Sequence, residues 1–533
     1  MTSVLLHRGH VYSPEDPFAT AMLIVDGRIA WLGDEAGALL HHDDASAVVD
    51  LRGALVAPAF VDAHVHLTST GLALTGLDLA GADSLGECLR RVGDASASEE
   101  GVILGHGWDD TSWPEGRPPT TAELDECVGG REVYLSRVDV HSALASSALR
   151  HRVPEASALD GWSADGPVAR AAHHALRESA LASVTARQRS RAQRVALETA
   201  ASRGIASVHE NAGPTISSGD DLLEALAMGH DPAMPEVVGY WGRLLGQEEA
   251  RDLGARGAAG DLFVDGSLGS HTACLESPYL DASPTSHGAA YLTAEQVAAH
   301  VAASTRAGQQ AGFHVIGDGA IQIVAEGLRA AAADVGLEAL RAARHRLEHL
   351  EMPSAEHLAL LADLGVVASV QPAFDAAWGG PHGMYSQRLG PVRAEGLNPF
   401  AGMLRAGVAL AFGSDAPVTP LDPWGAVRAA AWHTHAPHSI SVRAAFAAHT
   451  RGGRRAAREE SHQPGTLTLG APATYAVWAP GPLVVQAPDG RIAAWSTDPR
   501  SGTPPLPDLT DGAPGCWRTV RDGQIIFDSG DLT

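Results

Sequence analysis

Short apolar runs alternate with longer helical stretches along most of the chain. The apolar runs are bounded by turn residues, which is typical of buried parallel strands. The stretches between them, such as 294–311 and 355–364, have helical composition. Alternating strands and helices predict parallel βα units, and eight of them favour an α/β fold with a closed (β/α)8 TIM-like barrel over a doubly wound sheet. The predicted strands are 56–62, 204–209, 236–240, 261–265, 311–316, 345–349, 365–371 and 408–414.

Both ends of the chain have a different pattern, with short, partly alternating runs and tight turns. Residues 21–32 show it, and the segment from Leu467 onward repeats it, with Asp489-Gly490 and Asp522-Gly523 as hairpin turns. Such runs are typical of small antiparallel sheets. The long interval after the first barrel strand exceeds an ordinary βα connection and predicts an inserted cap. The expected domains are a composite β-sandwich from 1–57 and 465–533, and a barrel from 58–464 whose cap covers about 68–200.

Composition narrows the class of protein. Apolar residues make up 45% and charged residues 19% of the 533 residues, as in a folded globular protein. The net charge of −25 argues against nucleic acid or an anionic membrane as a partner, because both require a basic face. No apolar run is long enough for a signal segment or a membrane span, so we expect a cytoplasmic protein that acts on a small molecule. The four cysteines show no C-x-x-C spacing, which leaves no thiolate metal motif.

Histidines stand at the ends of several predicted strands. His64 and His66 end the first strand, and residues i and i+2 of a strand point to the same side, so both imidazoles can reach one ion. A bare His-x-His is a weak signal, since pairs such as His173-His174 occur in a chain with 26 histidines. Strand ends of a barrel converge, and three or more histidines with one carboxylate suit zinc. The remaining candidate ligands at strand ends are His314, His349 and Asp415.

These motifs together resemble the metal-dependent amidohydrolase superfamily, in particular amidohydrolase family 3 and its N-substituted formamide deformylase branch. The similarity rests on an ordered set that spans most of the chain: Pro-Ala-Phe-Val-Asp-Ala-His-Val-His, Gly-His-Gly-Trp-Asp-Asp, Phe-Val-Asp-Gly-Ser-Leu-Gly-Ser, Phe-His-Val-Ile-Gly-Asp, Leu-Glu-His, Val-Gln-Pro and Gly-Ser-Asp-Ala-Pro-Val. The resemblance implies the barrel with a terminal β-sandwich and hydrolysis of an amide-like bond. It also implies His64, His66, His314 and His349 as ligands, with Asp415 beside the ion. A homodimer is an expectation at the level of the family.

One departure from the family concerns lysine, which this chain lacks altogether; all 38 basic residues are arginine. Many superfamily members bridge two metals with a carboxylated lysine, and relatives often have lysine where this chain has Asp261. Either the centre holds one zinc, which we favour, or a carboxylate such as Asp261 or Glu210 bridges two. The absence of lysine also excludes Schiff-base chemistry and a P-loop.

The expected reaction is attack of a metal-activated water on a carbonyl. We assign catalytic roles to Asp415, as proton carrier, and to His349, with an uncommitted imidazole stabilising the oxyanion. A deaminase is an alternative, but those enzymes place Glu three residues after the strand-five His, where this chain has Gly317. A noncatalytic metal-binding barrel is a second alternative. Candidates for substrate contact are His106, Trp108, Asp109, His141, Gln371 and Arg388.

Overall fold

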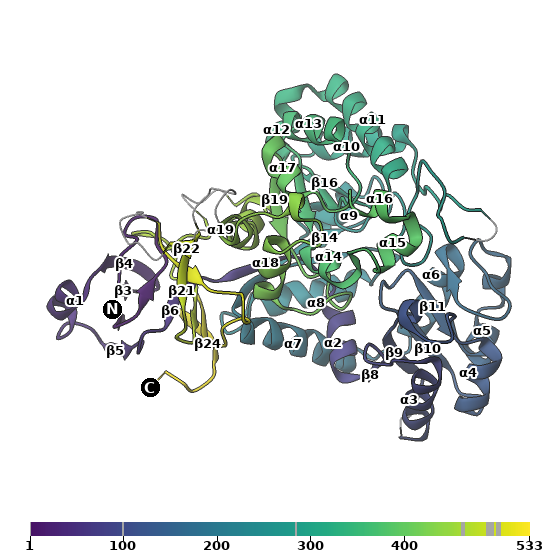
Figure 1. The fold of residues 1–533 in the computed structure, drawn as a ribbon, viewed down its shortest axis with the longest axis horizontal. Helices are drawn as coiled ribbons and strands as arrows, with labels where there is room; N and C mark the ends of the chain where they lie inside the picture. The colour runs from purple at the N-terminus through teal and green to yellow at the C-terminus, as the bar shows by residue number, and fades with distance from the viewer. Residues whose placement is uncertain are drawn as a thin grey trace.

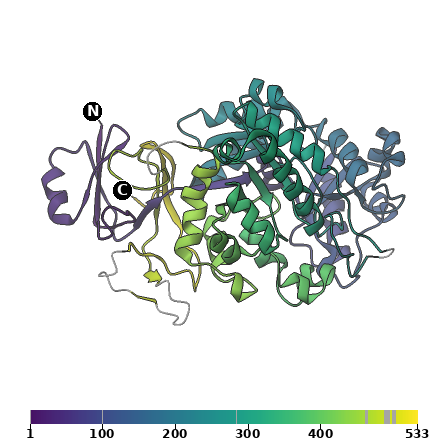
Figure 2. The ribbon, with the colours of Figure 1, turned by 90° about the horizontal axis from the view of Figure 1, so that it is seen from above.

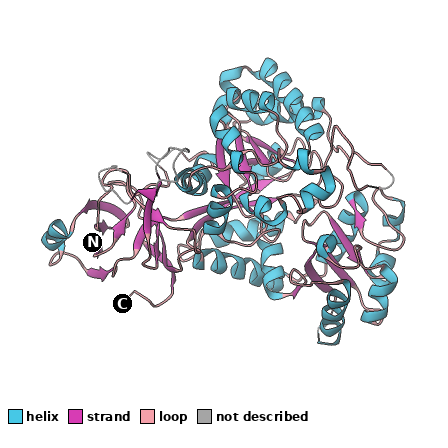
Figure 3. Cartoon of the chain, in the orientation of Figure 1, coloured by secondary structure: helices cyan, strands magenta, loops and turns pink. Residues whose placement is uncertain are grey.

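A computed structural model describes residues 2–98, 101–282, 285–459, 464–486, 495–496 and 503–532. A central α/β body lies between two smaller parts, the terminal sheets at one end and a cap at the other (Figures 1 and 2). Helices dominate the outside of the central body and strands its inside (Figure 3). None of the helices in these described ranges combines the length and apolar content that a membrane span requires.

Eight parallel strands build the central body: β7 (Phe60–Val65), β13 (Ile205–Ala212), β14 (Glu236–Trp241), β15 (Gly257–Ala258), β16 (Gln310–Val315), β17 (Arg346–His349), β18 (Val367–Val370) and β19 (Ala409–Phe412). They form two sheets, ordered β14-β13-β7 and β15-β16-β17-β18-β19. An isolated bridge between Val65 and Ala416 joins β7 to the residues after β19. Among the described residues no ladder pairs β14 with β15, so the strands follow barrel order without continuous hydrogen bonding around the ring.

The predicted strand at 261–265 is wrong in its position. The regular strand there is the two-residue β15, and Gly260 follows with a left-handed φ of 88°, which takes the chain out of the strand. Beyond it, only an isolated bridge from Phe263 to His314 continues the pairing. Asp261 therefore lies in irregular chain at the strand end.

The predicted strand at 56–62 is two strands. Its first half is β6 (Leu55–Pro58), which belongs to a terminal sheet, and its second half is β7 in the central body. Every residue of both is buried, so a continuous apolar run conceals the change of sheet.

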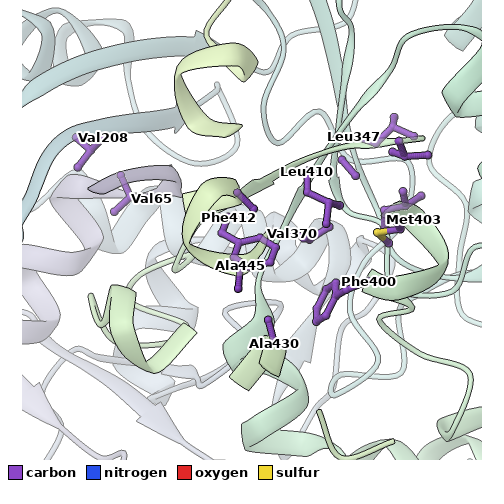
Figure 4. Close-up of a cluster of buried hydrophobic side chains, with 14 of the residues drawn as sticks. Val65, Val208, Leu347, Val370, Phe400, Met403, Leu410, Phe412, Ala430 and Ala445 are labelled. Atoms are coloured by element: carbon purple, nitrogen blue, oxygen red, sulfur yellow. The ribbon is translucent and has the colours of Figure 1, made fainter. Parts of the chain in front are cut away.

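Amphipathic helices pack around the strands and enclose one large apolar core. The predicted helical stretch at 171–203 is broken into α6 (Arg170–Leu181) and α7 (Ala186–Ser202), because Thr185 starts a new helix by accepting a hydrogen bond from Gln188 N. Side chains such as Phe400 and Phe412 fill the core (Figure 4). Other helices around the strands are α2 (Leu67–Thr75), α8 (Gly219–Gly229), α10 (Ala294–Arg306), α11 (Asp318–Val335), α13 (Ala355–Asp363), α17 (Phe400–Ala406) and α18 (Pro423–Ala431).

The cap is a separate layer with its own sheet, ordered β12-β11-β10-β9-β8. Its strands and helices are β8 (Leu77–Asp78), α3 (Leu85–Ser98), β9 (Ile103–Trp108), α4 (Thr121–Val128), β10 (Val133–Arg137), β11 (Ser142–Ala145), α5 (Ser147–Arg152), β12 (Val168–Ala169) and α6. The cap thus spans 77–181, inside the predicted range, because α7 packs on α2 and β13 of the central body.

The terminal part consists of two larger sheets, ordered β4-β3-β1-β5 and β2-β6-β20-β24-β25. The second draws strands from both ends of the chain, and Asp522-Gly523 forms the turn between its last two strands. The predicted turn at Asp489-Gly490 lies outside the described residues. The strands are β1 (Ser3–His7), β2 (His10–Val11), β3 (Ala21–Val25), β4 (Arg28–Gly33), β5 (Ala47–Asp50), β20 (Tyr475–Trp478), β24 (Cys516–Arg521) and β25 (Gln524–Asp528).

Candidate metal centre

Six buried side chains converge where the parallel strands end. Two come from β7 and its end, one each from the ends of β16 and β17, and two from the irregular chain after β15 and β19. They supply four imidazoles and two carboxylates, and their nearest donor atoms fall into overlapping groups whose atoms lie within 4.8 Å of one another. The six residues are His64, His66, Asp261, His314, His349 and Asp415.

Asp261 lies between two pairs of imidazoles. Its Oδ2 is 3.4 Å from His64 Nε2 and 3.2 Å from His66 Nε2. Its Oδ1 is 3.6 Å from His314 Nδ1 and 3.6 Å from His349 Nε2. Each carboxylate oxygen therefore faces a different pair.

Asp415 approaches the first pair from the end of the neighbouring strand β19. Its Oδ1 is 3.3 Å from His64 Nε2 and 3.1 Å from His66 Nε2. Its backbone N donates to His64 O at 2.8 Å, which ties the end of β19 to β7. Asp415 and His349 both have left-handed backbones, with φ of 54° and 71°. Such residues cost on the order of 1 kcal/mol or more and concentrate at functional sites, because the surrounding structure must impose them.

Partners on the far sides of the rings orient the imidazoles. His64 Nδ1 is hydrogen bonded to Glu348 Oε2 at 2.9 Å, so Nε2 faces the centre. His349 Nδ1 is 2.8 Å from Gln371 Oε1, and His314 Nε2 is 3.2 Å from Gly266 O. Outer contacts of this kind are what hold metal-ligating histidines in one tautomer and direction.

Glu348 is in turn fixed by a buried arginine. Arg346 Nε donates to Glu348 Oε1 at 2.6 Å, and both side chains are fully buried. Burial alone would raise the pKa of Glu348, but the Arg346 charge outweighs it and brings the pKa down to about 2. Glu348 is thus a carboxylate at ordinary pH and accepts a hydrogen bond from His64 Nδ1.

Without a cation, the two central carboxylates hold protons on the imidazoles. Burial opposes the charged form of His66, yet the adjacent carboxylates of Asp261 and Asp415 raise its pKa to about 9. Burial also opposes ionisation of Asp261, but the His64 charge and the other imidazoles hold the pKa of Asp261 well below its ordinary value. A divalent cation would replace these protons.

The donor atoms of this cluster are suited to a metal ion. Several of them are buried and make no hydrogen bond, which is costly for a folded protein unless another group satisfies them. Imidazole nitrogens with carboxylate oxygens are the ligand set of zinc and similar divalent ions. The unsatisfied atoms are His64 Nε2, Asp261 Oδ1, His314 Nδ1, His349 Nε2 and Asp415 Oδ1, which face the centre, together with His66 Nδ1.

A narrow cavity of about 20 Å³, room for about one water molecule, opens onto the cluster. Cap residues close over it, and His141 packs its ring 5.0 Å from that of His314 and 5.5 Å from that of Phe263. Burial, then the nearby His314, lowers the pKa of His141 to about 3, so His141 is neutral at ordinary pH. The cap contributes His141, His174, Val140 and Arg177 to the lining.

Other residues predicted to contact substrate lie elsewhere. Trp108 is buried in the cap and donates from Nε1 to Leu135 O. Asp109 pairs with Arg137 at 2.6 Å, Arg388 pairs with Asp281, and His106 bridges Ser136 and Pro417 O. None of these side chains lines the cavity, although His106 lines a cleft that adjoins it. Gln371 touches His349 rather than the cavity, and Glu210 accepts from Leu67 N at the start of α2.

Sequence reasoning missed several residues around the site. His174 and Arg177 stand one turn apart on α6 and line the cavity, although the pair His173-His174 looks like a chance repeat in the sequence. Their i, i+3 spacing on a predicted cap helix is a signal that could have identified them, because it places both side chains on the same face of the helix. Glu348 precedes the predicted ligand His349 in the Leu-Glu-His motif. Successive residues of a strand point to opposite faces, so the sequence gives no sign that Glu348 contacts His64.

Comparison with known proteins agrees with this geometry. The model of the amidohydrolase family matches residues 47–527. A crystal structure of an uncharacterized metal-dependent hydrolase from Pyrococcus furiosus is 26% identical, covers 89% of this chain and 98% of its own, and superposes with a TM-score of 0.68. Protein LONG AFTER FAR-RED 3 of Arabidopsis thaliana is 29% identical over 90% of this chain and 87% of its own. The N-substituted formamide deformylase of Arthrobacter pascens is 24% identical, over 77% of this chain and 80% of its own.

The fold and the family therefore define a metal-dependent hydrolase of the amidohydrolase superfamily. Within it, the chain belongs to amidohydrolase family 3, as its motifs predict.

Proposed function

We propose that this protein hydrolyses an amide-like carbon–nitrogen bond of a small molecule at a zinc centre in the mouth of a (β/α)8 barrel. The observation that carries the proposal is the convergence of unsatisfied buried donor atoms on one point beside a small cavity. The formamide deformylase of Arthrobacter pascens, a relative over most of the chain, supports the choice of bond.

The positions of the ligands support two ions rather than the single zinc favoured from the sequence. His64, His66 and Asp415 would hold one, and His314 and His349 the other. Asp261 faces both sets, one oxygen to each, and would hold both ions in place of the absent lysine. A bridging aspartate needs no carboxylation, so assembly of this centre would not depend on bicarbonate.

When bound, the zinc would supply an acidified water and would polarise the substrate carbonyl. Asp415 is placed to manage the proton. Its Oδ1 faces the imidazoles, and among the described residues no hydrogen bond engages its Oδ2. Oδ2 would accept the proton of the attacking water and deliver it to the leaving nitrogen.

His141 fits the role of oxyanion donor better than His349. Both nitrogens of His349 are engaged, one by Gln371 and one toward Asp261. The His141 ring has no hydrogen-bond partner in the described part of the chain and lines the cavity. As a neutral imidazole it can donate to an oxygen that becomes negative during attack.

Elemental analysis and product analysis on one preparation test the proposal. We expect about two zinc ions per chain and release of formate and butylamine from N-butylformamide, lost with chelator and restored by zinc. Asp261→Asn should lower the zinc content while the matched cap variant Asp109→Asn keeps it. Bicarbonate should have no effect on reloading.

Each alternative has its own outcome. Release of ammonia from a heterocyclic amine, without amide hydrolysis, would replace the proposal with a deaminase. A protein that holds zinc but hydrolyses none of the N-acyl compounds in a broad panel would be a noncatalytic binder. About one zinc per chain, unchanged by Asp261→Asn, would refute the bridge alone.

A further inference from the structure

Arg177 brings a positive charge from the cap to the edge of the metal centre. It lies on α6 and lines the cavity with His174, one turn before it. Its Nη2 donates to Ser69 Oγ at 3.4 Å, a long hydrogen bond to a neutral hydroxyl. Ser69 is on α2, three residues after His66, so this contact joins the cap to the helix that follows the first two ligands.

No carboxylate pairs with Arg177 among the described residues. Other arginines near the site pair with carboxylates: the buried Arg137 contacts three aspartates, and the half-buried Arg388 contacts Asp281 and Gly269 O. A chain with a net charge of −25 has carboxylates in excess. An arginine left without one beside a cavity is therefore an unusual placement, since a partly buried charge is stabilised by pairing.

The field of this charge reaches the neighbouring titratable groups. Burial lowers the pKa of His174 to about 4, and the Arg177 charge adds to that effect. His174 is therefore neutral and can donate or accept a hydrogen bond beside the guanidinium. Arg177 thus has a neutral hydroxyl as its hydrogen-bond partner and a neutral imidazole beside it, and no carboxylate of the described residues pairs with it.

An apolar cleft adjoins the cavity at Arg177. The cleft is lined by leucines from α2, from the cap sheet and from the end of α6, and it shares Arg177, Ser69, Val140 and Pro417 with the metal-site cavity. Arg177 stands at the junction. A molecule whose reacting bond lies at the metal centre would place its charged group at Arg177 and its apolar group in the cleft. The leucines are Leu72, Leu77, Leu104 and Leu181.

We infer that Arg177 binds a carboxylate of the substrate, so that the substrate is an N-acyl compound with an anionic group close to the scissile bond and an apolar side group. The inference rests on the proposed function and narrows its substrate class. The planar guanidinium matches a carboxylate with two parallel hydrogen bonds, which a neutral amide cannot accept in the same way. Arg177 is thus a specificity-determining residue, while the ligands and Asp415 act on any bound amide.

Two compounds that differ only in the carboxylate test this inference: N-formylleucine and its decarboxylated counterpart N-(3-methylbutyl)formamide. We expect the zinc-loaded protein to bind N-formylleucine roughly 10- to 100-fold more tightly by calorimetry, the range of a charge-assisted hydrogen-bonded pair. Arg177→Gln should remove that preference and leave affinity for the neutral compound unchanged. Arg177→Lys should restore part of it, because charge returns without the planar fork.

Arg170→Gln is the matched control. Arg170 lies on the same helix, carries the same charge and is paired with Asp160 at 3.2 Å, so its loss should leave the preference intact. Equal binding of both compounds, binding of neither, or a preference that survives Arg177→Gln would overturn the inference. The proposed function is judged separately, by zinc content and formate release: an enzyme that hydrolyses the neutral formamide without preferring the anion refutes only the role of Arg177.

Discussion

Two buried clusters of charge lie close together in this protein and differ in how well they are satisfied. In the cap, Arg137 contacts Asp109 at 2.6 Å, Asp139 at 3.2 Å and Asp110 at 3.4 Å. Hydroxyls complete the network, since Ser267 Oγ donates to Asp139 at 2.7 Å. At the ends of the barrel strands, by contrast, imidazole nitrogens and carboxylate oxygens face one another and several of them make no hydrogen bond.

This difference distinguishes a cluster with a structural role from a cluster that can bind a ligand. A cation enclosed by carboxylates and hydroxyls needs nothing further, so the Arg137 network is explained as the support of the cap. A cluster of acceptors and imidazoles that is incomplete by itself requires a ligand. Both clusters come from acidic or histidine-rich motifs, and the sequence does not tell them apart.

The largest effect should come from Asp415→Asn. The amide keeps the size of the side chain but cannot carry the proton, so we expect kcat for amide hydrolysis to fall roughly 10²- to 10⁴-fold. The urea midpoint should stay near that of the wild type, since the cap network is untouched. Steady-state kinetics at fixed zinc measures the change. Full turnover by this variant would remove Asp415 from the proton path.

The reverse behaviour is expected for Arg137→Met. Loss of the cation leaves buried carboxylates uncompensated, so the free energy of unfolding should fall by about 3–5 kcal/mol. Zinc per folded chain should not change. Urea denaturation and elemental analysis of the same sample check both statements; loss of zinc in folded protein would mean that the two clusters depend on each other.

A smaller effect is expected for Gln371→Leu. Removal of the amide that orients His349 should weaken zinc binding roughly 10- to 100-fold, as found for outer partners of metal ligands. KM for an amide substrate, measured at saturating zinc, should stay the same. A rise in KM with unchanged zinc affinity would instead support the substrate contact predicted from the sequence.

The smallest effect concerns pH and a histidine outside both clusters. Burial, then His300, lowers the pKa of His345 from its ordinary 6.5 to about 3. The unfolded chain therefore binds a proton below pH 6.5 that the folded chain does not, and stability falls as pH falls. Between pH 8 and pH 5 this residue alone should cost about 2 kcal/mol. The free energy of unfolding, measured by urea denaturation at the two pH values, should change by about 2 kcal/mol less in His345→Asn than in the wild type. The variant His382→Asn, at an exposed position, should behave as the wild type.

The sequence patterns predicted those features that depend on residues close together in the chain, namely most strands and the histidines at their ends. The apolar runs located most of the strands, and His64, His66, His314 and His349 follow from their ends. The prediction of the fourth strand was wrong because its regular part is only two residues long. Gly260 then turns the chain away, and the pattern of apolar residues does not show this turn.

Residues positioned by distant packing could not be found in this way. Arg177 reaches the site only because α6 folds back over the strand ends, and Trp108 is withdrawn from it by a hydrogen bond inside the cap. The two-sided position of Asp261 likewise depends on strands that are far apart in the chain. The local pattern of apolar residues carries no information about contacts between segments that are far apart in the chain.

The split between β6 and β7 has a consequence for biosynthesis. β6 pairs with β2 on one side, but on the other side Pro58 pairs with Tyr475, so this strand gains its second neighbour more than 400 residues later. At roughly 5–20 residues per second, a ribosome takes on the order of 20–80 s to make that neighbour. Until then one edge of β6 stays unpaired, and we expect the nascent protein to be most prone to aggregation in this interval.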